Sequence, residues 1–380
     1  MSTPTSVMKE RMQGAIALAK KAWGQTDCNP MVGARIFEKD RCLAEAYHQR
    51  SGGPHAEVLA LDAFEGPATD ETELYITLEP CSTKGRTGAC TDVIIRSGIK
   101  RVVVGTLDPN PLHQGKGIAV LKAAGIDLIT GIEEEACREL NMIYNHWIQY
   151  QRPFCAMKFA TTLDGCLSTA SGQSNWITSE RARNDVMRWR RLFPSIAVSH
   201  NTLCSDNPQL TSRLSEANEF QQESVHCPIR FVFNRQLRGI EKYDKFRLFQ
   251  DAFADQTIIV HADTVSSERL RVLQVMGFES WSISELGGQL SMESFFLRCA
   301  EAEIPGVYIE PGARLASQLL ANGWVDYLFV YQASKLLLDS EAASLGLRRK
   351  SQSMDECLSL HSVVRKELGA DYLTRGYMKK

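Results

Sequence analysis

Apolar positions in the first 150 residues follow two periods, one typical of helices and the other of strands. Helical spacing predicts helices over residues 7–23, 56–64, 91–97, 117–124 and 133–150. Short apolar runs predict strands at residues 31–37, 41–47, 74–78, 101–105 and 126–130. Because the later strands alternate with helices through short connections, we expect βαβ units around a largely parallel sheet.

A second pattern of the same kind begins after Arg152-Pro153, which ends the last predicted helix of the first half. Strands are predicted at residues 154–159, 196–199, 229–233, 258–261, 307–310 and 327–331. Helices are predicted at residues 181–192, 266–276, 291–302 and 313–321. We therefore expect two α/β domains, residues 1–150 and residues 151–380. The polar stretch 212–223 is expected to be a loop, and the tail beyond Leu338 has no pattern that predicts an element.

Composition narrows the class of protein. Apolar residues make up 44% and charged residues 23%, which is typical of a globular chain and excludes a collagen-like one. The net charge of −2 gives no general positive field, so we expect no nucleic-acid partner. No apolar run approaches the roughly 18 residues of a membrane span, and no signal peptide is evident, so we expect no membrane and a cytoplasmic location. The 11 cysteines are an odd number spread over a long chain, so most are expected to be reduced.

The strongest chemical pattern is His55-Ala56-Glu57 followed by Pro80-Cys81 and then Cys90. One histidine nitrogen and two thiolates give zinc three protein ligands and leave a fourth position for water. Zinc lowers the pKa of that water, and Glu57, at the start of a predicted helix, is placed to move protons beside it. H-x-E followed by Pro-Cys and a second Cys is the pattern of zinc nucleobase deaminases.

Two other interpretations of these residues stay open at this point. A structural zinc site closed by a fourth protein ligand would hold the fold together, and Glu57 or Cys28 is the candidate for that ligand. A chance match without metal is the other.

Residues around the zinc pattern carry a resemblance to a known family. They are Asn29–Gly33, Thr77–Ser82, Gly85–Cys90, Asp108–Pro111 and Gly115–Gly117. Together with His55-Ala56-Glu57 they resemble the bifunctional riboflavin-biosynthesis deaminase/reductases, which share the eight-residue gap between Cys81 and Cys90. The resemblance implies a cytidine-deaminase-like α/β/α domain that deaminates a diaminopyrimidinone carrying a ribosylamine 5-phosphate.

The same resemblance implies roles for individual residues of the first half. Asn29 would hydrogen-bond the pyrimidine ring, and Lys84 and Arg86 would bind the phosphate. Asp108 and Asn110 lie where family members hold the ribose, although an Asp-Pro-Asn-Pro turn explains both equally well.

The second half has no G-x-G-x-x-G after a strand, so a Rossmann fold is not indicated. Its segments Lys158–Gly165 and Ser171–Ser179 resemble the family's reductase domain, which has a dihydrofolate-reductase-like α/β fold and uses NADPH. The resemblance implies that Asp206 lies at the reaction centre and contacts the cofactor. It implies substrate binding by Ser174, Arg190, Leu210, Arg213 and Glu310, and cofactor binding by Ala160, Trp176, Thr202 and Gly312. Family members are commonly oligomeric, so a homo-oligomer is expected.

The chain departs from the family pattern at several positions. Thr83-Lys84 replaces two histidines in the first half. In the second half the departures are His200 for a small residue, Asn207 for an aspartate, Pro311 for Gly or Ala, Ser334 for a proline and Leu338 for a glycine. A second hypothesis is therefore a monofunctional zinc deaminase whose C-terminal half is a scaffold. Nucleic-acid base editing and a zinc-stabilised binding protein without catalysis are the remaining alternatives.

Overall fold

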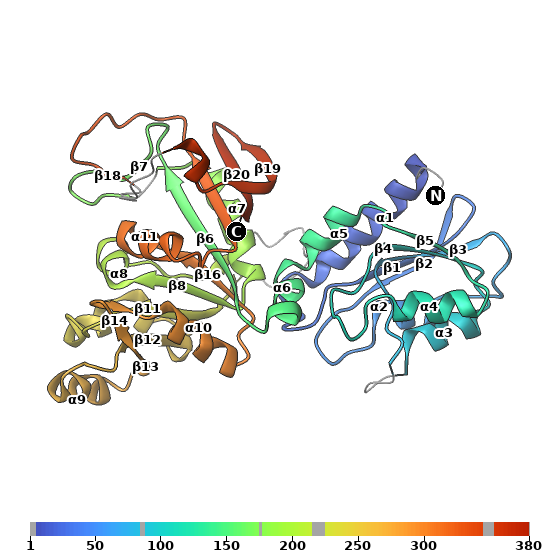
Figure 1. The fold of residues 1–380 in the computed structure, drawn as a ribbon, viewed down its shortest axis with the longest axis horizontal. Coiled ribbons are helices and arrows are strands. Elements are labelled where there is room, and N and C mark those ends of the chain that lie inside the picture. Colours follow the sequence, from blue (N-terminus) through green and yellow to red (C-terminus); the bar gives the residue numbers. More distant parts are fainter. Residues whose placement is uncertain (1–4, 84–87, 175–176, 215–224, 345–352, 380) are drawn as a thin grey trace. The chain divides into compact units, whose positions relative to one another are not determined.

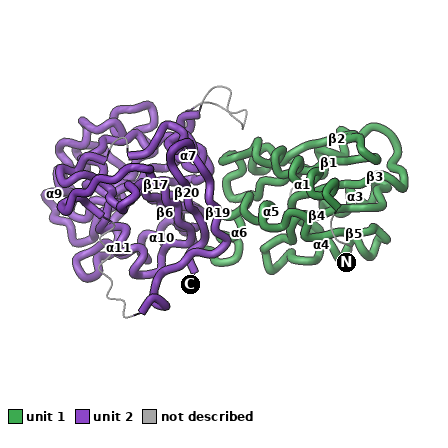
Figure 2. The backbone as a smooth tube through the Cα atoms, turned by 90° about the horizontal axis from the view of Figure 1, so that it is seen from above, with its two compact units in different colours: residues 1–151, 216–222 green, residues 152–215, 223–380 purple. Residues whose placement is uncertain are grey.

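The computed structural model describes residues 5–83, 88–174, 177–214, 225–344 and 353–379. These residues fall into two compact units, one ending at residue 151 and the other beginning at residue 152 (Figure 2). Each unit has a sheet of its own, and the two are described separately.

The first unit is built on a five-stranded sheet with the strand order β2-β1-β3-β4-β5 (Figure 1). The strands are β1 (Gly33–Glu38), β2 (Arg41–Tyr47), β3 (Thr72–Leu78), β4 (Arg101–Thr106) and β5 (Asp127–Thr130). Strand β1 runs antiparallel to β2 and β3, whereas β3, β4 and β5 are parallel. The carboxyl ends of β3 and β4 therefore meet at one edge of the sheet.

Helices cover both faces of this sheet. They are α1 (Ser6–Ala19), α2 (Ala56–Asp62), α3 (Cys90–Ser97), α4 (Lys116–Ala123), α5 (Glu134–Leu140) and α6 (Met142–Tyr150). Ala60 of α2, Ile94 of α3 and Leu121 of α4 share a buried cluster with Leu74 and Ile76 of β3. On the other face, α1 and α5 pack against Tyr75 and Val103. The unit is thus a three-layer α/β/α sandwich.

The helix predicted over 133–150 is two helices, α5 and α6, separated at Asn141. The Asn141 side chain is 5% exposed and hydrogen-bonds both backbone groups of Met31. The Met31 N–H donates to Oδ1 at 2.7 Å, and Nδ2 donates to the Met31 carbonyl at 2.9 Å. The Asn141 side chain thus provides the hydrogen bonds that a neighbouring strand would otherwise provide to the segment before β1. Hydrophobic periodicity does not predict such a tertiary contact.

The second unit is built on a nine-stranded sheet with the order β13-β12-β11-β8-β16-β6-β17-β20-β19. Its strands are β6 (Phe154–Thr161), β8 (Ser195–Ser199), β11 (Ile229–Phe233), β12 (Thr257–Ala262), β13 (Glu279–Ile283), β16 (Gly306–Glu310), β17 (Tyr327–Gln332), β19 (Leu360–Leu368) and β20 (Asp371–Met378). The strands from β13 to β17 are parallel, and the β19–β20 hairpin adds antiparallel strands at the edge.

Helices again lie on both faces. They are α7 (Glu180–Leu192), α8 (His200–Asp206), α9 (Ser267–Met276), α10 (Met292–Glu301) and α11 (Ala313–Ala321). Helices α10 and α11 contribute Phe295, Phe296 and Leu319 to the main core. Across the sheet, Trp189 of α7 packs on Phe329 at 4.8 Å between ring centroids. Among the described residues, no helix combines the length and the apolar character needed to cross a membrane.

Candidate active sites

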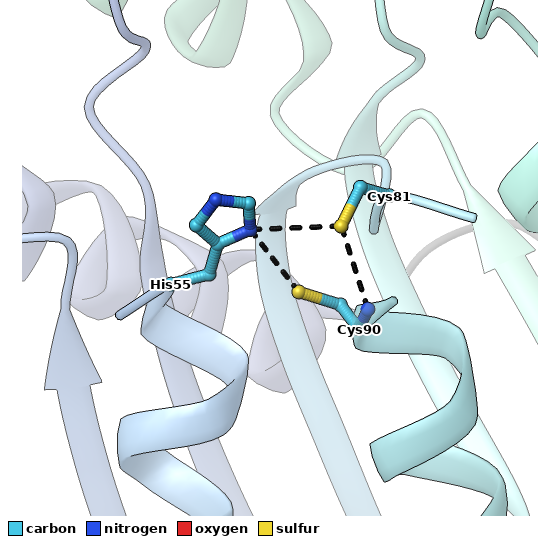
Figure 3. Close-up of side chains that lie close together, drawn as sticks. All are labelled: His55, Cys81 and Cys90. Atoms are coloured by element: carbon cyan, nitrogen blue, oxygen red, sulfur yellow. Dashed lines mark hydrogen bonds between the residues drawn. The ribbon is translucent and has the colours of Figure 1, made fainter. Parts of the chain in front are cut away.

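The three predicted metal ligands meet in the first unit (Figure 3). His55 directly precedes α2, Cys81 follows β3, and Cys90 begins α3. The Nδ1 atom of His55 lies 3.2 Å from Sγ of Cys90 and 3.6 Å from Sγ of Cys81. All three ligand atoms lie within 4.8 Å of one another, and no other such group of three occurs in the part of the chain that the structure describes.

This donor set fits zinc. One imidazole nitrogen and two thiolates are typical zinc ligands, and three protein ligands leave a position open. Neither Cys28 nor Glu57 belongs to the group, so the described residues supply no fourth ligand for a closed structural site. The hydrogen bond with Cys90, helped by His55, lowers the pKa of Cys81 to about 4, while the same bond and burial raise the pKa of Cys90. Cys81 and Cys90 together therefore carry one thiolate and one thiol proton. Zinc binding would release that proton.

Glu57 lies in the first turn of α2, two residues after His55, and is only 3% exposed. Burial raises the pKa of its carboxyl. A carboxyl whose pKa moves towards neutrality both accepts and returns a proton readily, which suits a general acid/base.

The Glu79 carboxylate fixes the turn that carries Cys81. It accepts hydrogen bonds from the backbone N–H groups of Asp108 (3.1 Å), Gly115 (2.9 Å) and Ile118 (3.2 Å). Gly117 packs so closely that an added Cβ would lie 2.1 Å from the Pro80 carbonyl oxygen. Glu79 belongs to the motif that contains Cys81, but no pattern in the sequence predicts these hydrogen bonds.

Asp108 and Asn110 both shape the turn after β4. The Asp108 Oδ1 accepts from the Asn110 N–H at 2.9 Å, and the Asn110 Oδ1 accepts from the Leu112 N–H at 3.0 Å. The turn-forming interpretation is therefore supported, and ribose contact stays a prediction. Asn29 donates to Ser51 Oγ at 3.3 Å. Lys84 and Arg86 lie outside the described residues.

A second site is a cavity of about 1230 Å³ within the second unit. It exceeds the roughly 300–1,000 Å³ of a pocket for one small molecule. Nine of the predicted reductase residues line it together: Ala160, Ser174, Arg190, Thr202, Asp206, Leu210, Arg213, Glu310 and Gly312. The tenth, Trp176, lies outside the described residues.

The carboxylates of this cavity are already paired. Glu310 receives Nε of Arg190 at 2.7 Å and lies 3.5 Å from Nζ of Lys158. Burial alone would raise the pKa of Glu310, but these two cations outweigh burial and lower it to about 2. Asp206 Oδ1 accepts from Ser174 Oγ at 2.9 Å and from Ser205 Oγ at 2.8 Å.

Arginines give the cavity an excess of positive charge. Arg183, Arg213, Arg235, Arg238, Arg247 and Arg314 line it beside Arg190 and Lys158, against the carboxylates of Asp206 and Glu310. Burial lowers the pKa of Arg213, and Arg190 and Arg247 lower it further. Because cationic side chains outnumber carboxylates in this lining, the cavity favours anionic ligands.

Comparison with known proteins agrees with both sites. Residues 5–106 match the cytidine and deoxycytidylate deaminase zinc-binding region, and residues 153–353 match the RibD C-terminal domain. The chain therefore combines a zinc deaminase region with a reductase domain.

Relatives extend over the whole chain. The riboflavin biosynthesis protein RibD of Aquifex aeolicus is 36% identical over 96% of this chain and 96% of its own length. The Escherichia coli protein of that name is 35% identical over 86% of this chain and 87% of its own. The Acinetobacter baumannii RibD structure has a TM-score of 0.79 at 30% identity, covering 98% of this chain and 99% of that one. The chain belongs to the RibD family of bifunctional riboflavin-biosynthesis deaminase/reductases.

Proposed function

We propose that the first unit deaminates 2,5-diamino-6-ribosylamino-4(3H)-pyrimidinone 5′-phosphate and that the second unit reduces the ribosyl group of the product with NADPH. A Thermotoga maritima structure described as a diaminohydroxyphosphoribosylaminopyrimidine deaminase/5-amino-6-(5-phosphoribosylamino)uracil reductase supports this. It has a TM-score of 0.77 at 30% identity and covers 98% of both chains. The observation that carries the proposal is that His55, Cys81 and Cys90 meet beside a buried Glu57.

The deaminase step rests on Glu57 and the three ligands. Bound zinc lowers the pKa of a water molecule, so that a nucleophile for the amine-bearing ring carbon is available at neutral pH. Glu57 takes up the water proton and returns protons to the ring and the leaving ammonia. Asn29 orients the ring through a hydrogen bond, and Lys84 and Arg86 attract the phosphate.

The reductase step needs a cavity that holds a dinucleotide and a phosphorylated sugar at the same time. NADPH supplies a hydride when bound, and the residues present fit such a group. The cavity is large, and Gly312 keeps its wall free of a side chain: an added Cβ would lie in van der Waals contact with Thr202 Oγ1 at 3.7 Å. Arg213 holds the substrate phosphate, and Arg190 contributes to substrate binding beside Glu310. Asp206, oriented by Ser174, contacts the sugar at the reaction centre.

The scaffold hypothesis is less well supported, because three departures from the family pattern form hydrogen bonds within the fold and two of them lie away from the cavity. Asn207 Oδ1 accepts from the Arg247 N–H at 2.9 Å, as a carboxylate oxygen would. Ser334 donates to the Ala370 carbonyl, and the Leu338 N–H donates to Asp164 at 2.9 Å. Neither Ser334 nor Leu338 lines the cavity.

The proposal is tested by incubating the purified protein with the diaminopyrimidinone ribosylamine phosphate, with and without NADPH. Ammonia release and loss of NADPH absorbance are followed together. Both signals are expected. Ammonia release without NADPH oxidation would support the scaffold hypothesis. The absence of both signals would contradict the bifunctional enzyme and the scaffold hypothesis alike. Cytoplasmic location and homo-oligomer formation stay predictions.

A further inference from the structure

His200 lines the reductase cavity at a position where the resemblance implies a small residue. Its imidazole either obstructs a ligand in the cavity or binds one, and its contacts distinguish the two. His200 is the first residue of α8, directly after β8. Its ring stacks on Tyr243, with centroids 5.9 Å apart and an interplanar angle of 17°. Nδ1 lies 2.7 Å from the Tyr243 hydroxyl. The imidazole is therefore held in place rather than free to fill the cavity.

The hydrogen bonds around Tyr243 determine which nitrogen of His200 carries the proton. The Asn234 amide is oriented by the Arg238 N–H, which donates to Oδ1 at 2.9 Å. Its Nδ2 then donates to the Tyr243 hydroxyl at 2.7 Å. Tyr243 is fully buried, so its own O–H needs an acceptor, and Nδ1 of His200 is placed to be that acceptor.

The neutral imidazole therefore carries its proton on Nε2. The Cys204 sulfur lies 3.7 Å from both ring nitrogens, so it is not aligned with the N–H direction of Nε2. Burial and the nearby Arg238 lower the pKa of His200, which keeps the ring neutral and the donor at Nε2. His200 thus offers one N–H donor to a ligand in the cavity.

Arg238 adds a positive charge near His200, close enough to lower the pKa of its imidazole. An added Cβ on Gly239, the residue after Arg238, would lie 3.8 Å from Cε1 of His200. Arg238 lines the same cavity and donates to the Gln236 side chain at 3.2 Å. Arg235, by contrast, is neutralised by Glu285 at 2.6 Å. Among the ion pairs of the described residues, none involves Arg238.

We propose that His200 and Arg238 bind a phosphate group of the nicotinamide dinucleotide, His200 as a neutral donor and Arg238 through its charge. The inference rests on the proposed reductase function. The phosphate is either the 2′-phosphate, which only NADPH carries, or the pyrophosphate, which NADH carries too. In the first case these residues also select NADPH over NADH.

Equilibrium binding of NADPH and of NADH to the full-length protein tests the proposal. His200→Phe keeps the ring volume and removes the donor, while Arg238→Met removes the charge. Each is expected to weaken NADPH binding about tenfold, because a hydrogen bond to a charged group is lost. Unchanged NADH binding assigns the 2′-phosphate, and a parallel loss assigns the pyrophosphate. Arg298→Met, outside the cavity, is the matched loss of charge and should leave both affinities unchanged.

Other results of these binding measurements would contradict the proposal. If His200→Gly, which removes the imidazole, binds NADPH as tightly as the parent, His200 contributes nothing to binding and the proposal is wrong. Tighter binding by this variant would show that the imidazole obstructs the cavity, which overturns the proposal too. Full NADPH affinity in both His200→Phe and Arg238→Met overturns it while leaving the reductase function intact. A parent protein that binds neither dinucleotide contradicts the reductase function itself. Circular dichroism and thermal melts establish that each variant is folded.

Discussion

The zinc centre and the reductase cavity assemble their chemistry in different ways. Residues 55–90 supply all three metal ligands, which lie at the ends of α2, β3 and α3 and touch one another. The nine predicted reductase residues that line the cavity come from positions 160 to 312, spread over several parallel strands and the segments that follow them. A compact site depends on a few interatomic distances, whereas the cavity depends on the register of a whole sheet.

The sharpest test of this comparison removes one ligand. Cys90→Ala is expected to lose zinc and all measurable deamination, because two ligands hold zinc far more weakly than three. NADPH binding should persist, because no zinc ligand lines the cavity. Metal analysis and the two separate assays measure this. Loss of both activities in a folded variant would contradict the independence of the two sites.

Glu57→Gln separates proton transfer from metal binding. Deamination should fall by about 10²–10⁴-fold, because the amide cannot accept a proton, while the zinc content stays at the parent level. The readouts are ammonia release and metal content. Normal deamination would exclude Glu57 from the mechanism, whereas lost zinc would show that Glu57 supports the metal.

Acid should destabilise the second unit through Glu310. Its pKa is lowered from 4.5 to about 2, so the stabilisation is complete above pH 4.5 and is lost as the pH falls towards 2. The loss is on the order of 3 kcal/mol. Denaturant unfolding of the parent and of Glu310→Gln between these pH values measures it. The variant should be less stable at neutral pH and less sensitive to acid, and equal acid sensitivity would contradict the assignment.

The smallest expected effect concerns the break between α5 and α6. Asn141→Ala removes both hydrogen bonds to the Met31 backbone and leaves buried groups unpaired, so the free energy of unfolding should fall by about 2 kcal/mol. Asn145→Ala is the matched control, because its amide donates only to the exposed Arg138 carbonyl. Similar losses in both variants would show that Asn141 has no special role.

The sequence predicted the two sites unequally for a physical reason. Metal ligation demands particular residue types at short spacing, so His55, Cys81, Cys90 and Glu57 were identifiable from chemistry alone. The cavity residues became identifiable only through the family resemblance, because strand order brings Asp206 and Glu310 together. Networks made by burial, such as that of Asn141 with Met31, leave no periodic pattern. The C-terminal hairpin was missed because β19 is largely exposed and alternates weakly.

The three backbone hydrogen bonds to Glu79 have a consequence for how the enzyme acquires its metal. The turn before Cys81 is held by a carboxylate and by close packing of Gly117, neither of which needs zinc. The ligands are thus prearranged, and a newly made chain is able to fold first and take up the ion afterwards. Zinc removed by a chelator is expected to rebind without unfolding of the chain. A shortage of zinc should therefore reduce the deaminase activity without reducing the amount of folded protein.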